Sequence, residues 1–397
     1  MAEQTRLVTA QENIKFATNM VMPEILRYMF MYLIIPITYL GSTLIVVSLQ
    51  AILYISVKPF SKYVYRKINY YLCYANYAHL CFYFSWYNDS DCYVYMNKNI
   101  DNYIGKEHAY IIYNHRYEID WCIVGNILNH FHCLGNCKGY LKNVLKYFPL
   151  IGWNCFFAEN IFLQRSFDKD RRIINKQVRE LVNYPDPMWL FLCPEGTRFT
   201  PDKHRYSLQY AREKGLPEFK HHLTPRTKGF VTSLAVMKGK MGAIYDITLT
   251  FDPQAVEPTF LNMLRGHKID AHFYIKRIPL ETVPEDEQGA SQFLYDLFEE
   301  KDKLQESFFN TGKYCSESDT ERAEKIKISP CYKLAIITAM WYSLIIVPLI
   351  YYIVKLLLTA NMYSLSIILG VILLFSLMFS TMLRMNVKKS SYAIASK

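Results

Sequence analysis

Residues 109–120 read AYIIYNHRYEID, an apolar run that is followed at once by a polar turn. The run Ala109–Tyr113 predicts a strand that is buried on both faces. The residues beyond the turn, from Trp121 to Leu128, have the apolar spacing of a helix. A strand that leads through a polar turn into a helix is the unit from which α/β domains are built, and functional groups gather at that turn.

The same alternation of strand-like and helix-like patterns continues from residue 101 to residue 310. The sequence therefore predicts an α/β domain over this range. Its expected elements, beyond the first unit, are a helix at 168–182 opened by an aspartate cap, a strand at 188–193, a polar helix at 204–214, a short helix from residue 227, and strands at 243–251 and 271–278.

The polar turn contains a histidine and an aspartate that are able to act as a pair. An imidazole accepts a proton near neutral pH, and a carboxylate on its far nitrogen fixes the tautomer and stabilises the protonated ring. Five helical residues span about 500°, so the pairing requires His115 to lie in the turn and Asp120 to reach back from the first helical turn. The alternative is purely structural, with His115 capping the helix and Asp120 complementing the helix dipole.

A second polar turn, Cys-Pro-Glu-Gly-Thr-Arg at residues 193–198, follows the predicted strand at 188–193. A glycine lets the backbone approach a ligand, and an arginine is able to hold a phosphate through two charge-assisted hydrogen bonds. One site would then combine a base with a phosphate clamp. The candidate catalytic residues are His115 and Asp120, and the candidate substrate-binding residues in this turn are Glu195, Gly196, Thr197 and Arg198.

Covalent catalysis and metal binding are weaker interpretations of the same region. A serine hydrolase needs a Gly-x-Ser-x-Gly elbow, which the sequence lacks. Cys193 is the tempting nucleophile, but it ends an apolar strand, where a cysteine more often packs than reacts. A group of possible zinc ligands lacks a second ligand pair at finger spacing, so no metal site is expected; these residues are His130, His132, Cys133 and Cys137.

Long apolar segments lie towards the two ends of the chain. Residues 28–57 contain no charged residue, and a helix of about 20 apolar residues crosses a bilayer, so a retained membrane anchor or a re-entrant hairpin is predicted there. Residues 334–354 and 362–383 predict a transmembrane helical hairpin. The segment 70–86, rich in tyrosine and phenylalanine, is either an interfacial helix or a helix packed against the domain.

These patterns predict the organisation of the whole chain. The segments are an N-terminal stretch at 1–27, the anchor at 28–57, an interfacial or linker region at 58–100, the α/β domain at 101–310, a linker at 311–333, two transmembrane helices within 334–383, and a basic tail at 384–397.

The distribution of charge bears on topology and partners. Basic residues flank the predicted spans on the side of the central domain, for example Lys58, Lys62, Arg66 and Lys67, so the positive-inside rule places that domain in the cytosol. The net charge of +10 suits anionic lipid or a phosphorylated substrate; without a reading helix or finger, nucleic acid is not an expected partner. Ten cysteines without regular spacing argue against a disulfide framework.

The two polar turns resemble motifs of the glycerolipid acyltransferase family. Its first block, Asn-His followed by four residues and Asp, is matched by residues 114–120, and its third block, Pro-Glu-Gly-Thr-Arg, by residues 194–198. The second block, an aromatic segment leading to a basic residue, is matched by residues 152–165 and makes Arg165 a second phosphate-binding cation. The fourth block departs from the family, because residues 243–251 supply the strand without the usual proline, and a core role is expected there.

The resemblance covers residues 110–310 and is strongest to the larger eukaryotic 1-acylglycerol-3-phosphate acyltransferases. It implies a mixed sheet flanked by helices, acyl-coenzyme A as co-substrate without a bound cofactor, and lysophosphatidic acid as acceptor. His115 would take the proton of the acceptor hydroxyl, Asp120 would orient it, and Arg165 and Arg198 would hold the phosphate.

Other functions and two locations stay open at this point. The same subgroup contains acyltransferases for lysocardiolipin and lysophosphatidylinositol, and a membrane protein that binds lipid without catalysis is a separate possibility. The expected partners are acyl-coenzyme A, a lysophospholipid and the lipid bilayer. The expected location is the endoplasmic reticulum membrane as a multi-pass protein, with the mitochondrial outer membrane as the alternative.

Overall fold

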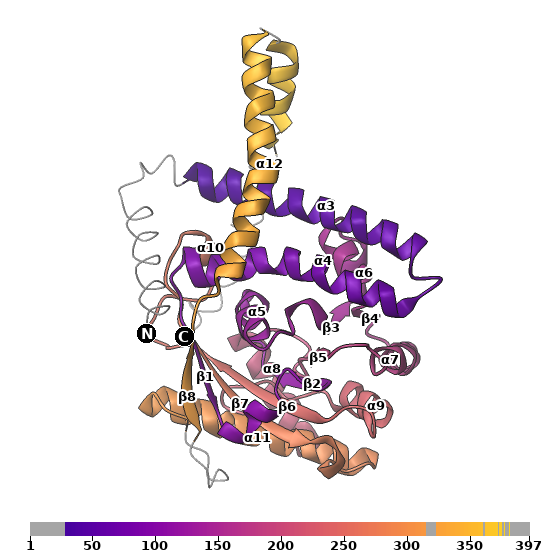
Figure 1. Cartoon of the computed structure of the whole chain (residues 1–397). Helices are drawn as coiled ribbons and strands as arrows, with labels where there is room; N and C mark the ends of the chain where they lie inside the picture. The colour runs from indigo at the N-terminus through magenta and orange to yellow at the C-terminus, as the bar shows by residue number, and fades with distance from the viewer. Residues whose placement is uncertain are drawn as a thin grey trace.

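The computed structural model describes residues 28–314, 323–359 and 362–371, together with residues 373, 374, 377 and 381. In this part of the chain an eight-stranded mixed sheet forms the middle layer of the domain, with helices on both faces (Figure 1). The predicted α/β fold class is therefore confirmed. The strands are β1 (Cys92–Met96), β2 (Ala109–Tyr113), β3 (Cys137–Lys142), β4 (Ile161–Leu163), β5 (Trp189–Leu192), β6 (Ala243–Thr250), β7 (Ala271–Pro279) and β8 (Glu324–Ile328).

Longer helices and short helical turns connect these strands. The helices are α3 (Ile35–Ser56), α4 (Lys62–Phe82), α5 (Asp120–His130), α6 (Ile151–Phe157), α7 (Phe167–Leu181), α8 (Pro201–Lys214), α9 (Thr227–Met237), α10 (Phe260–Leu264), α11 (Glu287–Thr311) and α12 (Tyr332–Leu358). The short turns are η1 (Phe30–Ile34), η2 (Tyr83–Tyr87), η3 (Lys98–Asn102), η4 (Leu134–Asn136), η5 (Asn143–Tyr147) and η6 (Leu280–Thr282).

The order of the strands across the sheet is β4-β3-β5-β2-β6-β7-β1-β8. The strands from β4 to β6 in this order are parallel, whereas β7 runs antiparallel to β6 and β8 antiparallel to β1. The carboxyl ends of parallel strands meet at one edge of a sheet. The turns after β2, β5, β3 and β4 therefore come together, and these turns contain the predicted site residues.

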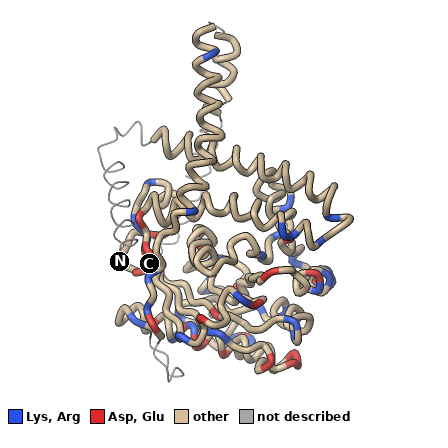
Figure 2. The backbone as a smooth tube through the Cα atoms, in the orientation of Figure 1, with Lys and Arg blue, Asp and Glu red and all other residues tan. Residues whose placement is uncertain are grey.

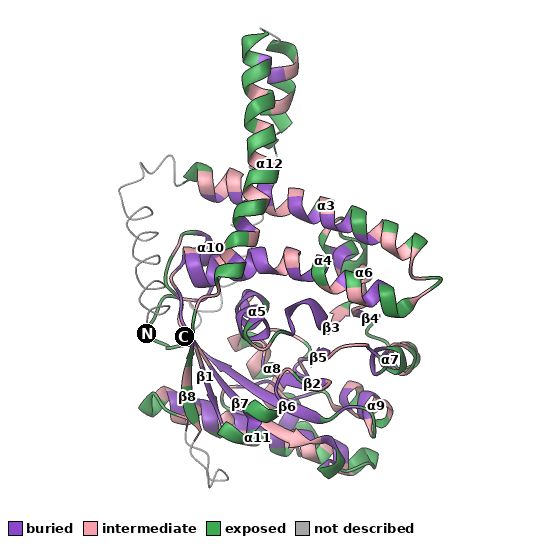
Figure 3. Cartoon of the chain, viewed as in Figure 1, coloured by how far each residue is buried: buried purple, intermediate pink, exposed green. Residues whose placement is uncertain are grey.

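The central strands are buried because helices cover both faces of the sheet. Alternate residues of β2 face opposite cores: Ile111 belongs to the same core cluster as Ile123 of α5, whereas Ile112 belongs to a second cluster with Val178 of α7 and Phe230 of α9. Figure 3 shows the central strands and α5 as buried. Burial on both faces explains why β2 and β5 are apolar runs rather than alternating patterns.

Most of the predicted elements of the domain are present. The strand at 109–113 is confirmed with its bounds, and those at 188–193, 243–251 and 271–278 differ from β5, β6 and β7 by one or two residues at their ends. The predicted aspartate cap of α7 is wrong, because Ser166 occupies the N-cap position and Asp168 lies in the first turn. Asp170 accepts a hydrogen bond from the backbone of Gln164 at 2.7 Å instead.

Two segments that were predicted as linkers contribute strands to the sheet. β1 lies in the segment 58–100 and pairs with β7, and β8 lies in the segment 311–333 and pairs with β1. Strand β8 was missed because this edge strand alternates apolar with charged residues, Glu-Lys-Ile-Lys-Ile. Strand β1, Cys-Tyr-Val-Tyr-Met, is a short run, and the partners of both strands are distant in sequence. The domain thus extends beyond the predicted bounds of 101–310.

Helix α4 is a packing helix, the second of the two alternatives for residues 70–86. Polar residues on its inner side are buried and have partners: Asn76 donates to the hydroxyl of Thr43 on α3 at 2.9 Å, and His79 contacts the hydroxyl of Tyr83 at 2.8 Å. These side chains need partners because burying an unpaired polar group is costly. Helix α4 therefore joins α3 to the domain.

The basic residues after α3 bind the domain rather than standing free. Glu159 forms ion pairs with Lys58 at 3.1 Å and Arg66 at 2.9 Å. Lys62 pairs with Glu180 and Lys67 with Asp186. Their positive charges are therefore largely neutralised by the domain, which weakens the use of this flank as a signal of membrane topology.

Two described helices are long and apolar enough to cross a membrane, residues 30–56 and α12. They differ in their surroundings: 44% of the most apolar window of the first helix is buried in the protein, against 11% for α12. Figure 1 shows α3 lying along α4 while α12 projects away from the domain, and Figure 2 shows both nearly free of charged residues. A further apolar helix occupies residues 362–371, and the rest of the predicted second hairpin helix lies mostly outside the described residues.

Candidate active site

The first polar turn brings His115 and Asp120 together as the sequence predicted. Nδ1 of His115 lies 2.9 Å from Oδ2 of Asp120, which is the first residue of α5. A carboxylate only accepts hydrogen bonds, so this contact places the ring hydrogen on Nδ1 and leaves Nε2 as an acceptor. The side chain of Asp120 is fully buried, whereas that of His115 is 25% exposed. The imidazole is thus held at Nδ1 by a buried carboxylate while the side chain remains partly exposed, an arrangement that suits a general base.

Asp120 also shapes the turn that carries the histidine. Its Oδ2 accepts backbone N–H groups of Arg116 at 2.7 Å and Tyr117 at 2.9 Å. The proposed alternative, a structural role at the start of the helix, is therefore part of what Asp120 does. The same oxygen orders the backbone and the imidazole, so the two roles coincide.

Asn114 fixes the end of β2 to its neighbour β6. Its side-chain oxygen accepts the backbone N–H of Leu249 at 2.8 Å, and its amide donates to the carbonyl of Leu249 at 2.9 Å. This side chain thus imitates one more pair of the β2–β6 ladder, whose last backbone register pair is Tyr113 with Ile247. His115 is held at a fixed distance beyond the sheet edge as a result.

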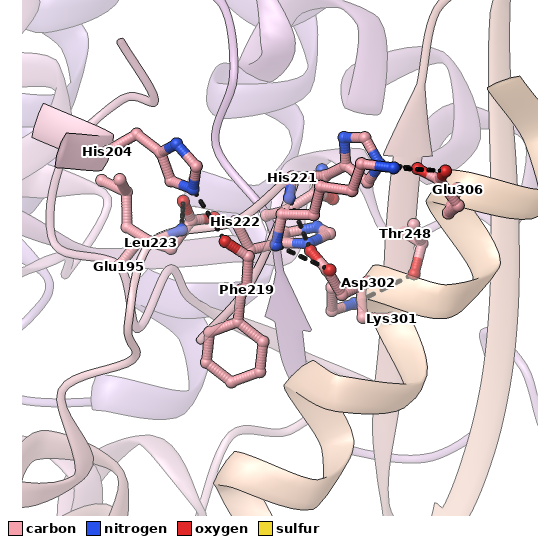
Figure 4. Close-up of polar contacts among 12 residues, drawn as sticks. Glu195, His204, Phe219, His221, His222, Leu223, Thr248, Lys301, Asp302 and Glu306 are labelled. Atoms are coloured by element: carbon pink, nitrogen blue, oxygen red, sulfur yellow. Dashed lines mark hydrogen bonds and ion pairs between the residues drawn. The ribbon is translucent and has the colours of Figure 1, made fainter. Parts of the chain in front are cut away.

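Glu195 joins the two polar turns from inside the protein. Its Oε1 accepts the backbone N–H of His115 at 3.1 Å, and its Oε2 accepts the backbone N–H of Leu223 at 3.2 Å. Figure 4 shows Glu195 beside Leu223. The residue is 3% exposed. Glu195 was predicted among the substrate-binding residues, but this burial and these contacts favour a role in positioning His115.

We expect the contribution of Glu195 to stability to be lost as the pH rises towards 8. Burial raises the pKa of Glu195 to about 8, from an ordinary value of 4.5. The folded protein then holds this proton more tightly than the unfolded chain, so the stabilisation is complete below pH 4.5 and disappears as the pH rises through about 8. The thermal unfolding midpoint of the protein in detergent, followed across this range, measures the effect.

The matched variant for this test is Glu195→Gln. Its amide accepts only one of the two backbone N–H groups, and a buried unpaired donor costs about 1–3 kcal/mol, so its unfolding midpoint should be lower. Because the variant does not titrate at this position, the difference between wild type and variant should shrink with rising pH. A difference that stays constant with pH would contradict the protonation of Glu195.

Gly196 and Thr197 lie beside two cations, Arg226 and Lys203. Gly196 has a φ of 67°, a backbone conformation that favours glycine, and it lies beside the side chain of Arg226. The hydroxyl of Thr197 accepts from Nζ of Lys203 at 2.7 Å, and the same ammonium donates to the carbonyl of Arg198 at 3.0 Å. Thr197 thus shares in ordering this turn.

Arg198 and Arg165 lie in one group of cations. The side chain of Arg198 pairs with Glu118 at 2.9 Å and remains 39% exposed. Partial burial and the positive charges of Arg165 and Arg198 lower the pKa of Lys142, and partial burial, Arg198, Lys142 and Arg165 lower that of Lys203. We call these four residues, Lys142, Arg165, Arg198 and Lys203, the cation cluster. Such mutual repulsion is relieved by an anion.

The cluster is assembled by the sheet. Lys142 ends β3, Arg165 follows β4 and Arg198 follows β5, and these neighbouring strands are parallel. Arg165 has a φ of 63°, which non-glycine residues seldom adopt and which often marks a functional position. The backbone N–H of Phe199 donates to the carbonyl of His115 at 2.9 Å, which keeps His115 beside this edge. The arrangement is suited to deprotonating a hydroxyl on an anionic substrate.

Cys193 is not arranged as a nucleophile. Burial, with the negative charges of Glu195 and Asp120 beside it, raises the pKa of its thiol well above the ordinary value. The nucleophilic form of cysteine is the thiolate, which this environment disfavours. Within the residues that the structure describes, no group of histidine, cysteine and carboxylate side chains is placed to hold a metal ion.

Four residues of this region were not predicted from the sequence: Lys142, Lys203, Arg226 and Asn114. Lys142 ends β3, whose sequence Cys-Lys-Gly-Tyr-Leu-Lys has no clear strand pattern. Lys203 and Arg226 lie beyond the two polar turns in sequence, and no role was predicted for them. The signal for Asn114 was available, because it stands directly before the histidine at the end of a predicted strand.

Comparisons with known proteins agree with this geometry. Residues 93–251 match the family described as Acyltransferase, and residues 262–341 match Acyltransferase C-terminus. The chain is 40% identical to 1-acyl-sn-glycerol-3-phosphate acyltransferase gamma of Mus musculus over 259 residues, which are 65% of this chain and 69% of the relative. It is 38% identical to 1-acyl-sn-glycerol-3-phosphate acyltransferase delta of Rattus norvegicus over 281 residues, 71% of this chain and 74% of the relative.

Proposed function

We propose that this chain, which belongs to the acyltransferase family, transfers a fatty acyl group from acyl-coenzyme A to the free hydroxyl of lysophosphatidic acid and so forms phosphatidic acid. The observation that carries the proposal is the His115–Asp120 pair beside the cation cluster. The names of the relatives support the acceptor, since they are 1-acyl-sn-glycerol-3-phosphate acyltransferases.

His115 acts as the general base in this reaction. Its Nε2 takes the proton of the acceptor hydroxyl, and the oxygen attacks the thioester carbonyl to form a tetrahedral intermediate. As this intermediate collapses, the carbon–sulfur bond breaks and the coenzyme A sulfur leaves with the proton from the imidazolium. Asp120 stabilises the charged ring through Nδ1. The thioester is already activated, so no covalent acyl-enzyme is needed, which fits the buried thiol of Cys193.

The cation cluster holds the phosphate of the acceptor. Charge-assisted hydrogen bonds to phosphate are the strong ones, and the fork of an arginine gives two of them at once. Arg198 is oriented by Glu118, whose other oxygen accepts the backbone N–H of Phe260 at 2.9 Å. A fixed guanidinium loses less entropy on binding than a mobile one.

The site takes its lipid from a bilayer beside it. Apolar residues are exposed on the outer side of α3 and on the segment from η5 to α6, among them Leu44, Ile52, Tyr147, Phe148 and Trp153. Between these elements lies a groove of about 540 Å³, lined almost entirely by apolar side chains with Lys146 among them. Exposed aromatic rings with basic residues nearby suit the membrane interface. We place the protein in the endoplasmic reticulum membrane, spanned by α12, with the domain on the cytosolic side.

The test is acyl transfer by the purified full chain in detergent. Oleoyl-coenzyme A is supplied with lysophosphatidic acid, lysophosphatidylinositol or lysocardiolipin, and both thiol release and the lipid product are measured. We expect thiol release and phosphatidic acid in equal amounts with lysophosphatidic acid, at a kcat/KM above that for the other acceptors.

The other outcomes separate the competing functions. Preference for lysocardiolipin or lysophosphatidylinositol would keep the enzyme class and change the acceptor. Thiol release without lipid product would indicate a thioesterase. Folded protein that shows no reaction with any acceptor would leave a lipid-binding role.

A further inference from the structure

The catalytic turn is connected to a distant part of the chain through Glu195. One oxygen of this carboxylate holds the backbone N–H of His115, and the other holds the backbone N–H of Leu223. The position of His115 therefore depends on the loop 219–223, which precedes α9. Residues that hold this loop in place therefore also influence the position of His115.

The loop is fixed by one residue of α11. Oδ2 of Asp302 accepts the backbone N–H of Lys220 at 2.8 Å, and Oδ1 accepts that of His221 at 2.7 Å and contacts Nδ1 of His222 at 2.9 Å (Figure 4). Burial lowers the pKa of His222 to about 4, so its imidazole is neutral near pH 7 and donates from Nδ1. Asp302 thus satisfies three donors in a row, directly before Leu223.

Helix α11 is itself held to the sheet by the preceding residue. Lys301 is fully buried; its ammonium pairs with Asp246 of β6 at 2.6 Å and donates to the carbonyl of Ile247 at 2.9 Å and the hydroxyl of Thr248 at 3.2 Å. A buried ion pair contributes little net stability on average, so its clearer consequence here is a defined geometry. The position of Asp302 relative to β6 is thereby fixed.

These contacts close a ring around the base. β6 holds Asn114 through Leu249, and it holds α11 through Lys301. Asp302 then holds the loop, and Leu223 and Glu195 return the connection to His115. His222 itself is 1% exposed and does not reach a substrate, so it is not a second base.

We propose that Asp302 is a positioning residue for the catalytic base, acting through the loop 219–223 and Glu195. This rests on the proposed function, in which His115 takes the proton of the acceptor hydroxyl. It assigns to the region beyond the matched Acyltransferase segment, residues 262–341, a part in organising the active site. Asp302 affects the rate of the chemical step and not the binding of either substrate.

Glu306, one turn further along α11, gives a matched control. It binds the same loop, but only through the side chains of Lys220 and His221 at the surface. Asp302 binds the backbone of the loop instead. Each substitution therefore removes one carboxylate that binds this loop. Only the substitution of Asp302 removes a carboxylate that binds the loop backbone.

The experiment compares Asp302→Asn and Glu306→Gln in the full chain in detergent. We expect Asp302→Asn to lower kcat about 10- to 100-fold with both KM values unchanged, since a misplacement on the order of 1 Å costs about 100-fold. Glu306→Gln should keep kcat within about twofold, as surface ion pairs contribute little. Equal losses in both variants, or a loss confined to KM, would overturn the proposal.

A second measurement does not depend on activity. Hydrogen–deuterium exchange of the peptide that contains His115 should be faster in Asp302→Asn than in wild type and unchanged in Glu306→Gln. Inactive wild-type protein with this exchange pattern would refute the proposed function alone, whereas unchanged exchange in Asp302→Asn would refute the positioning role.

If Asp302→Asn does not fold, His222 carries the same test. His222→Asn retains a donor near the position of Nδ1, and His222→Leu removes it. We expect kcat to be retained in the first variant and lowered in the second. Equal rates in the two would overturn the proposal.

Discussion

His115→Ala should lower kcat for acyl transfer by about 10² to 10⁴, the usual contribution of a general base, while the protein remains folded. Nε2 of His115 is the acceptor that the contact with Asp120 leaves available, and its loss removes the proton acceptor from the site. The side chain is partly exposed, so its truncation opens no large cavity in the core. Initial rates with saturating oleoyl-coenzyme A and lysophosphatidic acid measure the effect, and a thermal unfolding scan checks the fold.

Two further variants separate base catalysis from a structural role of the histidine. His115→Asn keeps a donor towards Asp120 but supplies no base, so it should be as inactive as the alanine variant. His130→Ala removes an exposed histidine at the opposite end of α5 and should retain kcat within about twofold, as a surface substitution does. Substantial activity in His115→Asn would show that the histidine acts by ordering the turn.

Arg198→Gln should raise the KM for lysophosphatidic acid about 10- to 100-fold. A hydrogen bond to a charged group contributes about 1.5–3 kcal/mol, and each 1.4 kcal/mol is about a factor of ten in affinity. Arg198→Lys should recover only part of the loss, because an ammonium keeps the charge but not the fork. Lys142→Gln should change KM in the same direction, since Lys142 and Arg198 belong to one cluster.

Arg205→Gln is the matched control for this prediction. Arg205 lies on α8 next to the cluster in sequence, but its side chain is 75% exposed and pairs with Asp202 at the surface. The same change of charge there should leave KM within about twofold. A rise in KM confined to oleoyl-coenzyme A in Arg198→Gln would instead assign the cation cluster to the phosphates of coenzyme A.

The pairing of His115 with Asp120 was predictable because it is local. Both residues belong to one strand–turn–helix unit, and the bounds of β2 and the start of α5 followed from apolar spacing. The side on which Glu195 lies was not predictable. Its motif suggested contact with substrate, but the backbone after β5 turns the carboxylate inward, where it meets two N–H groups from turns that are 80 and 28 residues away.

The cation cluster was predictable only in part, for a related reason. Arg198 followed from its motif and Arg165 from a resemblance, whereas Lys142 follows a strand whose polar sequence gave no signal. The three come together because β4, β3 and β5 are adjacent and parallel. Strand order depends on which edges pair across long stretches of chain, and the local pattern of one strand does not specify it.

The sequence by itself determined the fold class, the apolar segments and the pairing of His115 with Asp120, because each follows from the spacing of neighbouring residues. Only the tertiary structure decided that α4 packs inside, that Glu195 is buried, and that Asp302 is connected to the turn of His115 through Leu223 and Glu195. The physical reason is that hydrophobic periodicity is a local property, whereas the partner of a buried polar group is chosen by the packing of elements distant in the chain.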